Sequence, residues 1–268
     1  MLPAMRRAFR WRLFGCCLLL GLAGCARSWF EEREPWRHEA EISCLKSGTV
    51  KESPSVAVTK AIDGPGACGV DFPLRVAALG ETALVSFAEE SSAARQVAVA
   101  PAATLACPLV SALDRFVSDS VQPAARRWFS QPVVGIKQIS AYSCRGMNDV
   151  PDARISEHAF GNALDIAAFT LADGRTITVK DGWHGTPAEQ GFLHDIQDAA
   201  CTVFATVLAP GSNAYHEDHM HVDLMRRPSG RTICEPAALP GEAASFRAGG
   251  HYGSTRHAEV PGAAAARR

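Results

Sequence analysis

Two stretches of the chain repeat apolar residues at the three- and four-residue spacing of an amphipathic helix. The first predicts a helix over 104–128, with Thr104 as its N-cap. Pro123 is expected either to kink this helix or to begin a second one, because proline has no N–H for the helical hydrogen bond. The second stretch predicts a helix over 192–208, which ends before a Pro-Gly pair.

Shorter stretches with alternating or β-branched residues predict strands. The turn residues Asp173 and Gly174 suit a tight hairpin that joins two of them, and the polar segment 142–155 is expected to be a loop of the kind that lines sites. The chain shows no internal repeat, and the mixture of helices and strands indicates an α+β domain. The expected strands are 83–87, 96–100, 133–139, 163–171, 175–180 and 219–225.

The N-terminus has the three zones of an export signal: a basic stretch, a short apolar run and the sequence Leu-Ala-Gly-Cys that ends at Cys25. The apolar run is shorter than the roughly 20 residues that a membrane-spanning helix needs. We interpret 1–25 as a lipoprotein signal peptide with lipid on Cys25, and 26–40 as a polar tether. The alternative is an ordinary cleaved signal that happens to contain this cysteine.

Composition and charge define the remaining segments. The 27 basic and 28 acidic residues give a formal charge of −1, so nothing indicates a nucleic-acid partner. We expect one folded domain over 41–235. Residues 236–268 are rich in alanine, glycine and arginine with little hydrophobic pattern, and we expect a disordered tail there.

Cysteine usage indicates an oxidising compartment. Outside the signal and Cys25, six cysteines remain and none forms a C-x-x-C pair, so we expect three disulfides rather than free thiols. Their order along the chain suggests that each joins its nearest neighbour. The candidates, in that order, are Cys44 with Cys68, Cys107 with Cys144, and Cys201 with Cys234.

Two short clusters of polar residues, about 55 positions apart, carry the candidate chemistry. One contains His158 and Asp165, and the other contains His219, His221 and Asp223 at alternate positions of an expected strand, which puts these three on one face. A catalytic zinc ion takes three nitrogen or oxygen ligands and keeps one position open for water. One histidine and one aspartate from the first cluster with one histidine from the second would supply that set.

The arrangement of these residues resembles a known superfamily. Ser156-x-His158-x-x-Gly161-x-Ala163-x-Asp165, followed by His219-x-His221, is similar to the signature shared by lysostaphin-type peptidases, D-Ala-D-Ala metallopeptidases and the hedgehog signalling domain. Together with 142–145 and 216–224, it is most similar to the bacterial extensin-like C-terminal domain family. The resemblance spans roughly 44–234 and implies a hedgehog/D,D-peptidase-like fold, in which a small antiparallel sheet with flanking helices bears a zinc site.

The same resemblance implies the roles of individual residues. His158, Asp165 and His221 would bind Zn²⁺, with His219 beside the metal-bound water. His219 or His216 would be the general base, because histidine titrates near neutral pH. Many related enzymes have glutamate three positions before the last ligand, where this chain has Asp218, and that departure leaves the base open. Arg145 resembles an arginine that binds a substrate carboxylate, although an ordinary ion pair is the alternative.

We therefore expect a zinc metallopeptidase of the cell envelope, acting on peptidoglycan stem peptides as a D,D-carboxypeptidase or endopeptidase. As a periplasmic lipoprotein it would be anchored by its N-terminal lipid, in the outer membrane because no retention signal follows Cys25. The main alternative is a peptidoglycan-binding lipoprotein that keeps zinc without turnover. A weaker one is a disulfide-stapled scaffold with no metal.

Overall fold

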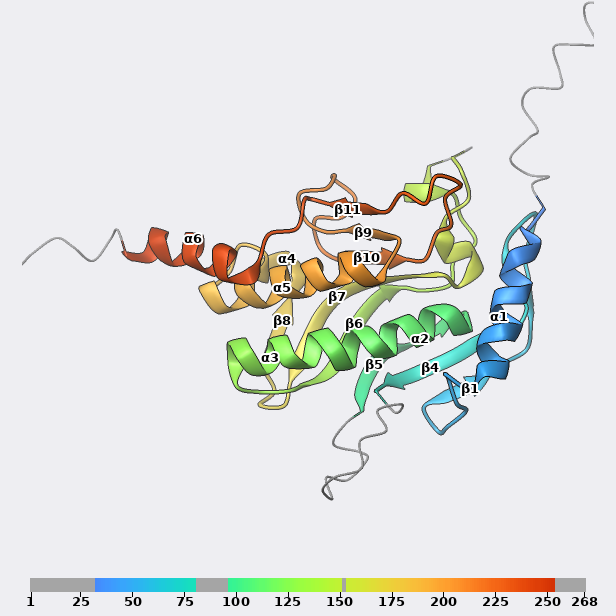
Figure 1. Ribbon diagram of the computed structural model, residues 1–268, viewed down its shortest axis with the longest axis horizontal. Helices are drawn as coiled ribbons and strands as arrows, with labels where there is room; N and C mark the ends of the chain where they lie inside the picture. Colours follow the sequence, from blue (N-terminus) through green and yellow to red (C-terminus); the bar gives the residue numbers. More distant parts are fainter. Residues whose placement is uncertain (1–31, 81–95, 151–152, 254–268) are drawn as a thin grey trace, which may run out of the picture.

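The computed structural model describes residues 32–80, 96–150 and 153–253 (Figure 1). Cys25, the expected strand 83–87 and the start of the expected tether lie outside them. In these parts of the chain, no helix is long and apolar enough to cross a membrane. The helices are α1 (Pro35–Ser47), α2 (Cys107–Phe116), α3 (Gln122–Phe129), α4 (Val179–Gly182), α5 (Pro187–Val203) and α6 (Gly241–Gly253).

The core is a nine-stranded sheet in which β8 lies beside β7, and the other strands follow the order β1-β4-β5-β6-β7-β10-β9-β11. Two pairs, β5 with β6 and β9 with β11, are parallel and the others are antiparallel, while β2 and β3 form a separate ribbon. The α+β prediction is confirmed, but the sheet is mixed and larger than the small antiparallel one that was expected. The strands are β1 (Val56–Val58), β2 (Ile62–Asp63), β3 (Gly69–Val70), β4 (Leu74–Leu79), β5 (Val97–Leu105), β6 (Val133–Ser140), β7 (Ala163–Leu171), β8 (Thr176–Thr178), β9 (Thr206–Leu208), β10 (Met220–Asp223) and β11 (Ile233–Glu235).

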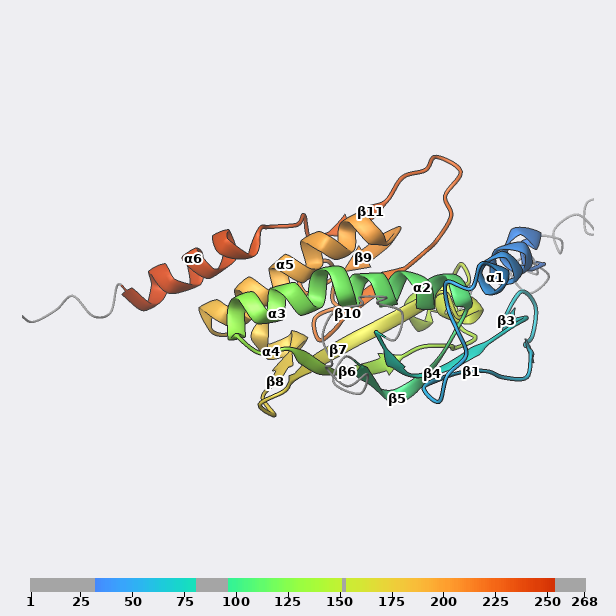
Figure 2. The ribbon, with the colours of Figure 1, turned by 60° about the horizontal axis from the view of Figure 1, so that its bottom comes forward.

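The hydrophobic core lies between the sheet and the helices α2, α3 and α5, which Figure 2 shows along one face of the sheet. Its centre is aromatic: the Phe169 and Phe192 rings lie 5.3 Å apart, and the Phe116 and Phe204 rings 5.4 Å apart, both edge to face. Such pairs contribute beyond the area that they bury. The other face of β7 and β10 is therefore free to carry polar groups.

The long helix predicted over 104–128 is two helices joined by a π-helical turn, Val117–Val121. The wider turn precedes Pro123, whose ring would clash with a carbonyl of the preceding turn in a regular α-helix. Thr104 was wrong as the N-cap: it belongs to β5, and α2 is preceded by Ala106.

Several element boundaries differ from the prediction. The second helix is α5, which starts at a capping box formed by Thr186 and Glu189 and ends at Val203. Val207 and Leu208 are in β9 instead, because they pair with β10. The expected strand 175–180 is split between β8 and α4, and the turn before it has Gly174 at φ 86°. Strand β7 has the predicted bounds.

Helices occur at both ends where the sequence suggested none. Helix α1 includes residues 35–40 of the expected tether; its buried side chains are Arg37 and Glu41, which are polar, so hydrophobic periodicity did not reveal it. Helix α6 lies in the expected disordered tail and packs against α5. Its alanines Ala244 and Ala248, four positions apart, are buried.

Three disulfides are present, but two of the predicted pairings are wrong. Cys44 pairs with Cys107, which joins α1 to the first residue of α2, and Cys68 pairs with Cys144, beside Arg145. Neighbour order failed because α1 was not foreseen and brings Cys44 to α2. The third disulfide, between Cys201 and Cys234, is the predicted one.

Candidate metal centre

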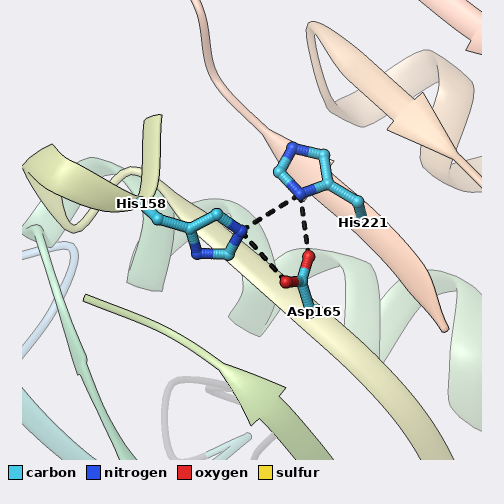
Figure 3. A group of neighbouring side chains, drawn as sticks. All are labelled: His158, Asp165 and His221. Atoms are coloured by element: carbon cyan, nitrogen blue, oxygen red, sulfur yellow. Dashed lines mark hydrogen bonds and ion pairs between the residues drawn. The ribbon is translucent and has the colours of Figure 1, made fainter. Parts of the chain in front are cut away.

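Asp165 and His221 lie side by side on neighbouring strands. They are Cα partners in the antiparallel pairing of β7 with β10. Their chain neighbours Ile166 and Met220 belong to the core, and successive side chains of a strand point to opposite faces. Asp165 and His221 therefore lie on the face of the sheet opposite the helices, as Figure 3 shows.

His158 reaches the same point from a single 3₁₀ turn, Glu157–Phe160. Ser156 caps this turn by accepting a hydrogen bond from the His158 backbone N–H. Gly161 ends it at φ 60°, and a Cβ atom there would lie 2.9 Å from the backbone nitrogen of Ala106. Glycine is thus required both by the left-handed conformation and by the close approach of β5.

The ligand atoms of the three residues converge. His158 Nε2 lies 3.1 Å from Asp165 Oδ2 and 3.2 Å from His221 Nδ1, and His221 Nδ1 lies 2.8 Å from Asp165 Oδ1. Tetrahedral zinc keeps ligands about 2.0–2.2 Å away, which separates neighbouring ligand atoms by roughly 3.3–3.6 Å. Two of the three distances are close to the lower limit and the third requires a small rotation of the carboxylate. The group could therefore hold a metal ion.

Hydrogen bonds on the far side of each ring fix the histidine orientations. His158 Nδ1 donates to the backbone carbonyl of Ala141 at 2.7 Å, which leaves Nε2 with its lone pair toward the cluster. His221 Nε2 lies 3.1 Å from Asp223 Oδ2 and donates to it, which leaves Nδ1 toward the cluster. Outer partners of this kind fix the tautomer that a metal ligand needs.

The electrostatics of the cluster favour a positive charge beside Asp165. Burial opposes ionisation of Asp165, but hydrogen bonds and charges from His158 and His221 outweigh it and hold the pKa of this carboxyl well below its usual range. Burial likewise disfavours a charged His221, yet Asp165 and Asp223 raise the pKa of that imidazole to about 9. Without a metal ion, a proton on His221 supplies the positive charge between the carboxylates.

The other histidines of the second cluster border this group. His219 Nε2 lies 3.6 Å from Asp165 Oδ1, and its Nδ1 donates to Asp218 Oδ1 at 2.9 Å. His216 Nδ1 donates to Asn213 Oδ1 at 2.7 Å, while burial and the neighbouring histidines lower the pKa of His216 to about 4. His219 thus directs one nitrogen at the cluster.

Arg145 and Asp218, two candidates from the sequence, differ in their distance from the cluster of His158, Asp165 and His221. Arg145 Nη2 lies 3.8 Å from Asp165 Oδ2, so the guanidinium stands next to the cluster. The Asp218 side chain is 58% exposed and supports His219 from outside, without lining the cavity. The structure therefore brings Arg145 to the site but not the carboxylate of Asp218.

Comparison with known protein families confirms the resemblance to the extensin-like family. The model of the family described as extensin-like protein C-terminus matches residues 42–235. The chain belongs to this family. No curated protein and no solved structure matches it. The family domain of this extensin-like protein contains all three residues of the candidate metal-binding group.

The cluster of the extensin-like domain opens into a cavity of about 210 Å³. Arg145 and the short helical turn Met147–Asp149 border it on one side, and β9 contributes Thr206 and Leu208 on another. Tyr215 lies at its edge with 56% of the side chain exposed. The cavity is polar where it meets His158, Asp165 and His221.

Some residues of this extensin-like site were not foreseen. Asn213 orients His216 but stands outside the motif, and Glu157 occupies the unspecified position between Ser156 and His158. Glu157 is 3% exposed and binds Arg37 of α1, 120 residues away. The signal in the sequence was an acidic residue directly before a candidate ligand. Its burial and its partner, Arg37, could not be found without α1.

Proposed function

We propose that this protein is a zinc-dependent peptidoglycan peptidase of the cell envelope, acting as a D,D-carboxypeptidase or an endopeptidase. The observation that carries the proposal is the convergence of His158, Asp165 and His221 in an open cavity, with His219 beside them. Two histidines and one aspartate form a three-ligand set that suits catalytic zinc. The resemblance of the motif from Ser156 to Asp165 and of His219-x-His221 to the signature of lysostaphin-type and D-Ala-D-Ala peptidases supports the same conclusion.

The residues around the cluster have distinct roles in the proposed hydrolysis. Zinc, when bound, would polarise the scissile carbonyl and acidify water. His219 would accept the proton of the attacking water at Nε2, since Asp218 holds its other ring nitrogen. Arg145 would bind a carboxylate of the stem peptide with two parallel hydrogen bonds. His216, held by Asn213, is the second candidate for the base.

We further propose that the chain is exported, lipidated on Cys25 and anchored in the outer membrane, so that the site stays near the cell wall. The zoned N-terminus and the three disulfides support this localisation. Mass spectrometry of the mature N-terminus from cells tests it. A diacylglycerol-modified Cys25 is expected, whereas an unmodified N-terminus downstream of Cys25 would refute the anchor.

The decisive experiment measures zinc content and cleavage together. The protein is incubated with purified muropeptides and the products are identified by mass spectrometry, for wild type and for His158→Ala, Asp165→Ala and His221→Ala. We expect one zinc per chain, chelator-sensitive products, and loss of both in the three variants. His184→Ala is the matched control, because His184 is exposed and does not line the cavity. Undiminished cleavage in all three variants would refute the proposal.

One observation favours a second candidate, a zinc-containing module that binds peptidoglycan without cutting it. The Asp218 carboxylate, which takes the place of a glutamate base in many related enzymes, does not line the cavity. Zinc and muropeptide affinity without any product would support this module. Absence of zinc would leave only a disulfide-stapled scaffold.

A further inference from the structure

A buried ion pair links α1 to the turn that carries His158. Arg37 Nη1 and Nη2 donate to Oε2 and Oε1 of Glu157, both at 2.9 Å, which is the two-pronged geometry that guanidinium and carboxylate favour. Both side chains are almost wholly buried, with 6% and 2% of their surfaces exposed. Arg37 is itself fixed by Glu34, which accepts from its Nε at 2.7 Å.

Glu157 holds both ends of the His158 turn. It directly precedes His158, its carboxylate accepts from Asn162 Nδ2 at 2.5 Å, and its backbone carbonyl accepts from Asn162 N at 3.0 Å. The turn between these two residues is the segment that aims His158 at the cluster. Glu157 is also one of the residues that line the cavity.

Arg37 lies outside the part of the chain that the family model matches, 42–235. Its guanidinium stacks 3.7 Å from the centre of the Phe160 ring, on the same turn, and the disulfide of Cys44 with Cys107 ties α1 to α2. Helix α1 therefore contacts the turn through both an ion pair and a stacking interaction. A buried carboxylate that loses its cation carries an unpaired charge and must move toward water or another donor.

We propose that Arg37 is a positioning residue for the metal site, which holds His158 in ligand geometry through Glu157. The proposal rests on the metal site described above and adds a part of the chain that precedes the family domain. Zinc affinity in this protein then depends on α1, although α1 contributes no ligand.

The test uses the full chain with Arg37→Met, Glu157→Gln and the double variant. Arg33→Ala is the matched control, because Arg33 lies just before α1 and makes its ion pair with Asp71, at 2.8 Å, rather than with Glu157. Zinc affinity is measured by competition with a chromophoric chelator. Visible absorption of the Co²⁺-loaded protein reports the ligand geometry, which a purely structural role would leave unchanged, and thermal unfolding checks that each variant folds.

We expect Arg37→Met and Glu157→Gln each to raise the zinc Kd about 10- to 100-fold, the range seen when outer partners of ligands are removed, and to shift the Co²⁺ bands. The double variant should be no weaker than the worse single one, because both changes break one interaction. The zinc Kd of Arg33→Ala should stay within about 2-fold of the wild-type value.

A folded Arg37→Met protein with unchanged Kd and Co²⁺ bands would overturn the inference, as would a double variant whose loss equals the product of the single losses. If Arg37→Met does not fold, Arg37→Lys, which keeps the charge but not the two-pronged geometry, is judged by the same criteria. Failure of the wild type to bind zinc would instead refute the proposed function, so the two failures are distinguishable.

Discussion

The contact between Asp223 and His221 gives the sharpest test of the metal site. Asp223 Oδ1 accepts the backbone N–H of Met225 at 2.9 Å, and Oδ2 accepts from His221 Nε2 at 3.1 Å. The carboxylate is buried, with 4% of its side chain exposed. Asp223 therefore keeps a proton on His221 Nε2, so that Nδ1, toward Asp165 and His158, is the nitrogen that would give up its proton to a metal ion.

Asp223→Asn keeps the shape of the side chain but reverses this hydrogen bond. The amide oxygen will stay on the Met225 N–H, because that group can only donate, and the amide NH₂ will then face His221 Nε2. His221 must accept there and carry its proton on Nδ1, the nitrogen that should bind the metal. We expect the zinc Kd to rise about 10- to 100-fold, which corresponds to about 1.4–2.8 kcal/mol of binding free energy.

Zinc affinity is measured by chelator competition at fixed pH and ionic strength, with circular dichroism as the check on folding. Asp218→Asn makes the same chemical change at an exposed carboxylate, which contacts His219 rather than one of the three candidate ligands. Its zinc Kd should stay within about 2-fold of the wild-type value. Asp223→Ala removes the partner without imposing the wrong tautomer, so its loss should be smaller than that of Asp223→Asn. An Asp223→Asn protein that binds zinc like wild type, or better than Asp223→Ala, would refute this reasoning.

Three further predictions concern the free energy of unfolding, measured by urea denaturation. Replacing Cys201 and Cys234 by alanine should cost about 3.7 kcal/mol from the entropy of a 33-residue loop, and a loss under about 1 kcal/mol would contradict that estimate. Thr186→Ala should cost about 1 kcal/mol because it removes the capping box of α5, whereas an unchanged midpoint would show that the cap contributes nothing. Phe169→Ala should cost about 3–5 kcal/mol, because its fully buried ring packs on Phe192; a loss near zero would mean that the cavity collapses.

Local sequence patterns were sufficient where an element is defined by its own residues. Strand β7 has the predicted bounds because the Asp173-Gly174 turn limits one end and the turn that ends at Gly161 limits the other. The buried stripe of α2 followed from the spacing of Leu109, Leu113 and Phe116. In such segments local propensity and burial agree, so the sequence alone is informative.

Long-range contacts decided the elements that the sequence did not predict. Val207 and Leu208 continue the apolar spacing of α5, but the chain leaves the helix at Phe204 because β9 pairs with β10 on one side and β11 on the other. Helix α1 lacks an apolar stripe and is held by polar contacts of Arg37 and Glu41 and by one disulfide. The residues that determine the structure of each segment lie elsewhere in the chain, so the pattern within the segment could not predict it.

The candidate site was largely predictable because its residues lie in two short motifs. Alternation along the last strand placed His219, His221 and Asp223 on one face, and the structure gathers all three around the cluster. Two features were out of reach: the support of the His158 turn by Arg37, which requires the packing of α1, and the exposure of Asp218, which depends on the path of the chain before β10.

The register of one strand pair sets both the core and the proposed chemistry. In the pairing of β7 with β10, Asp165 faces His221 on the open side, while the next pair, Ile166 with Met220, points into the core. A slip of β10 by one residue would turn Met220 to the open face and place the His221 imidazole among the core side chains, away from Asp165. The free energy of burying Ile166 and Met220 therefore also holds Asp165 and His221 within 2.8 Å of each other, before any metal binds.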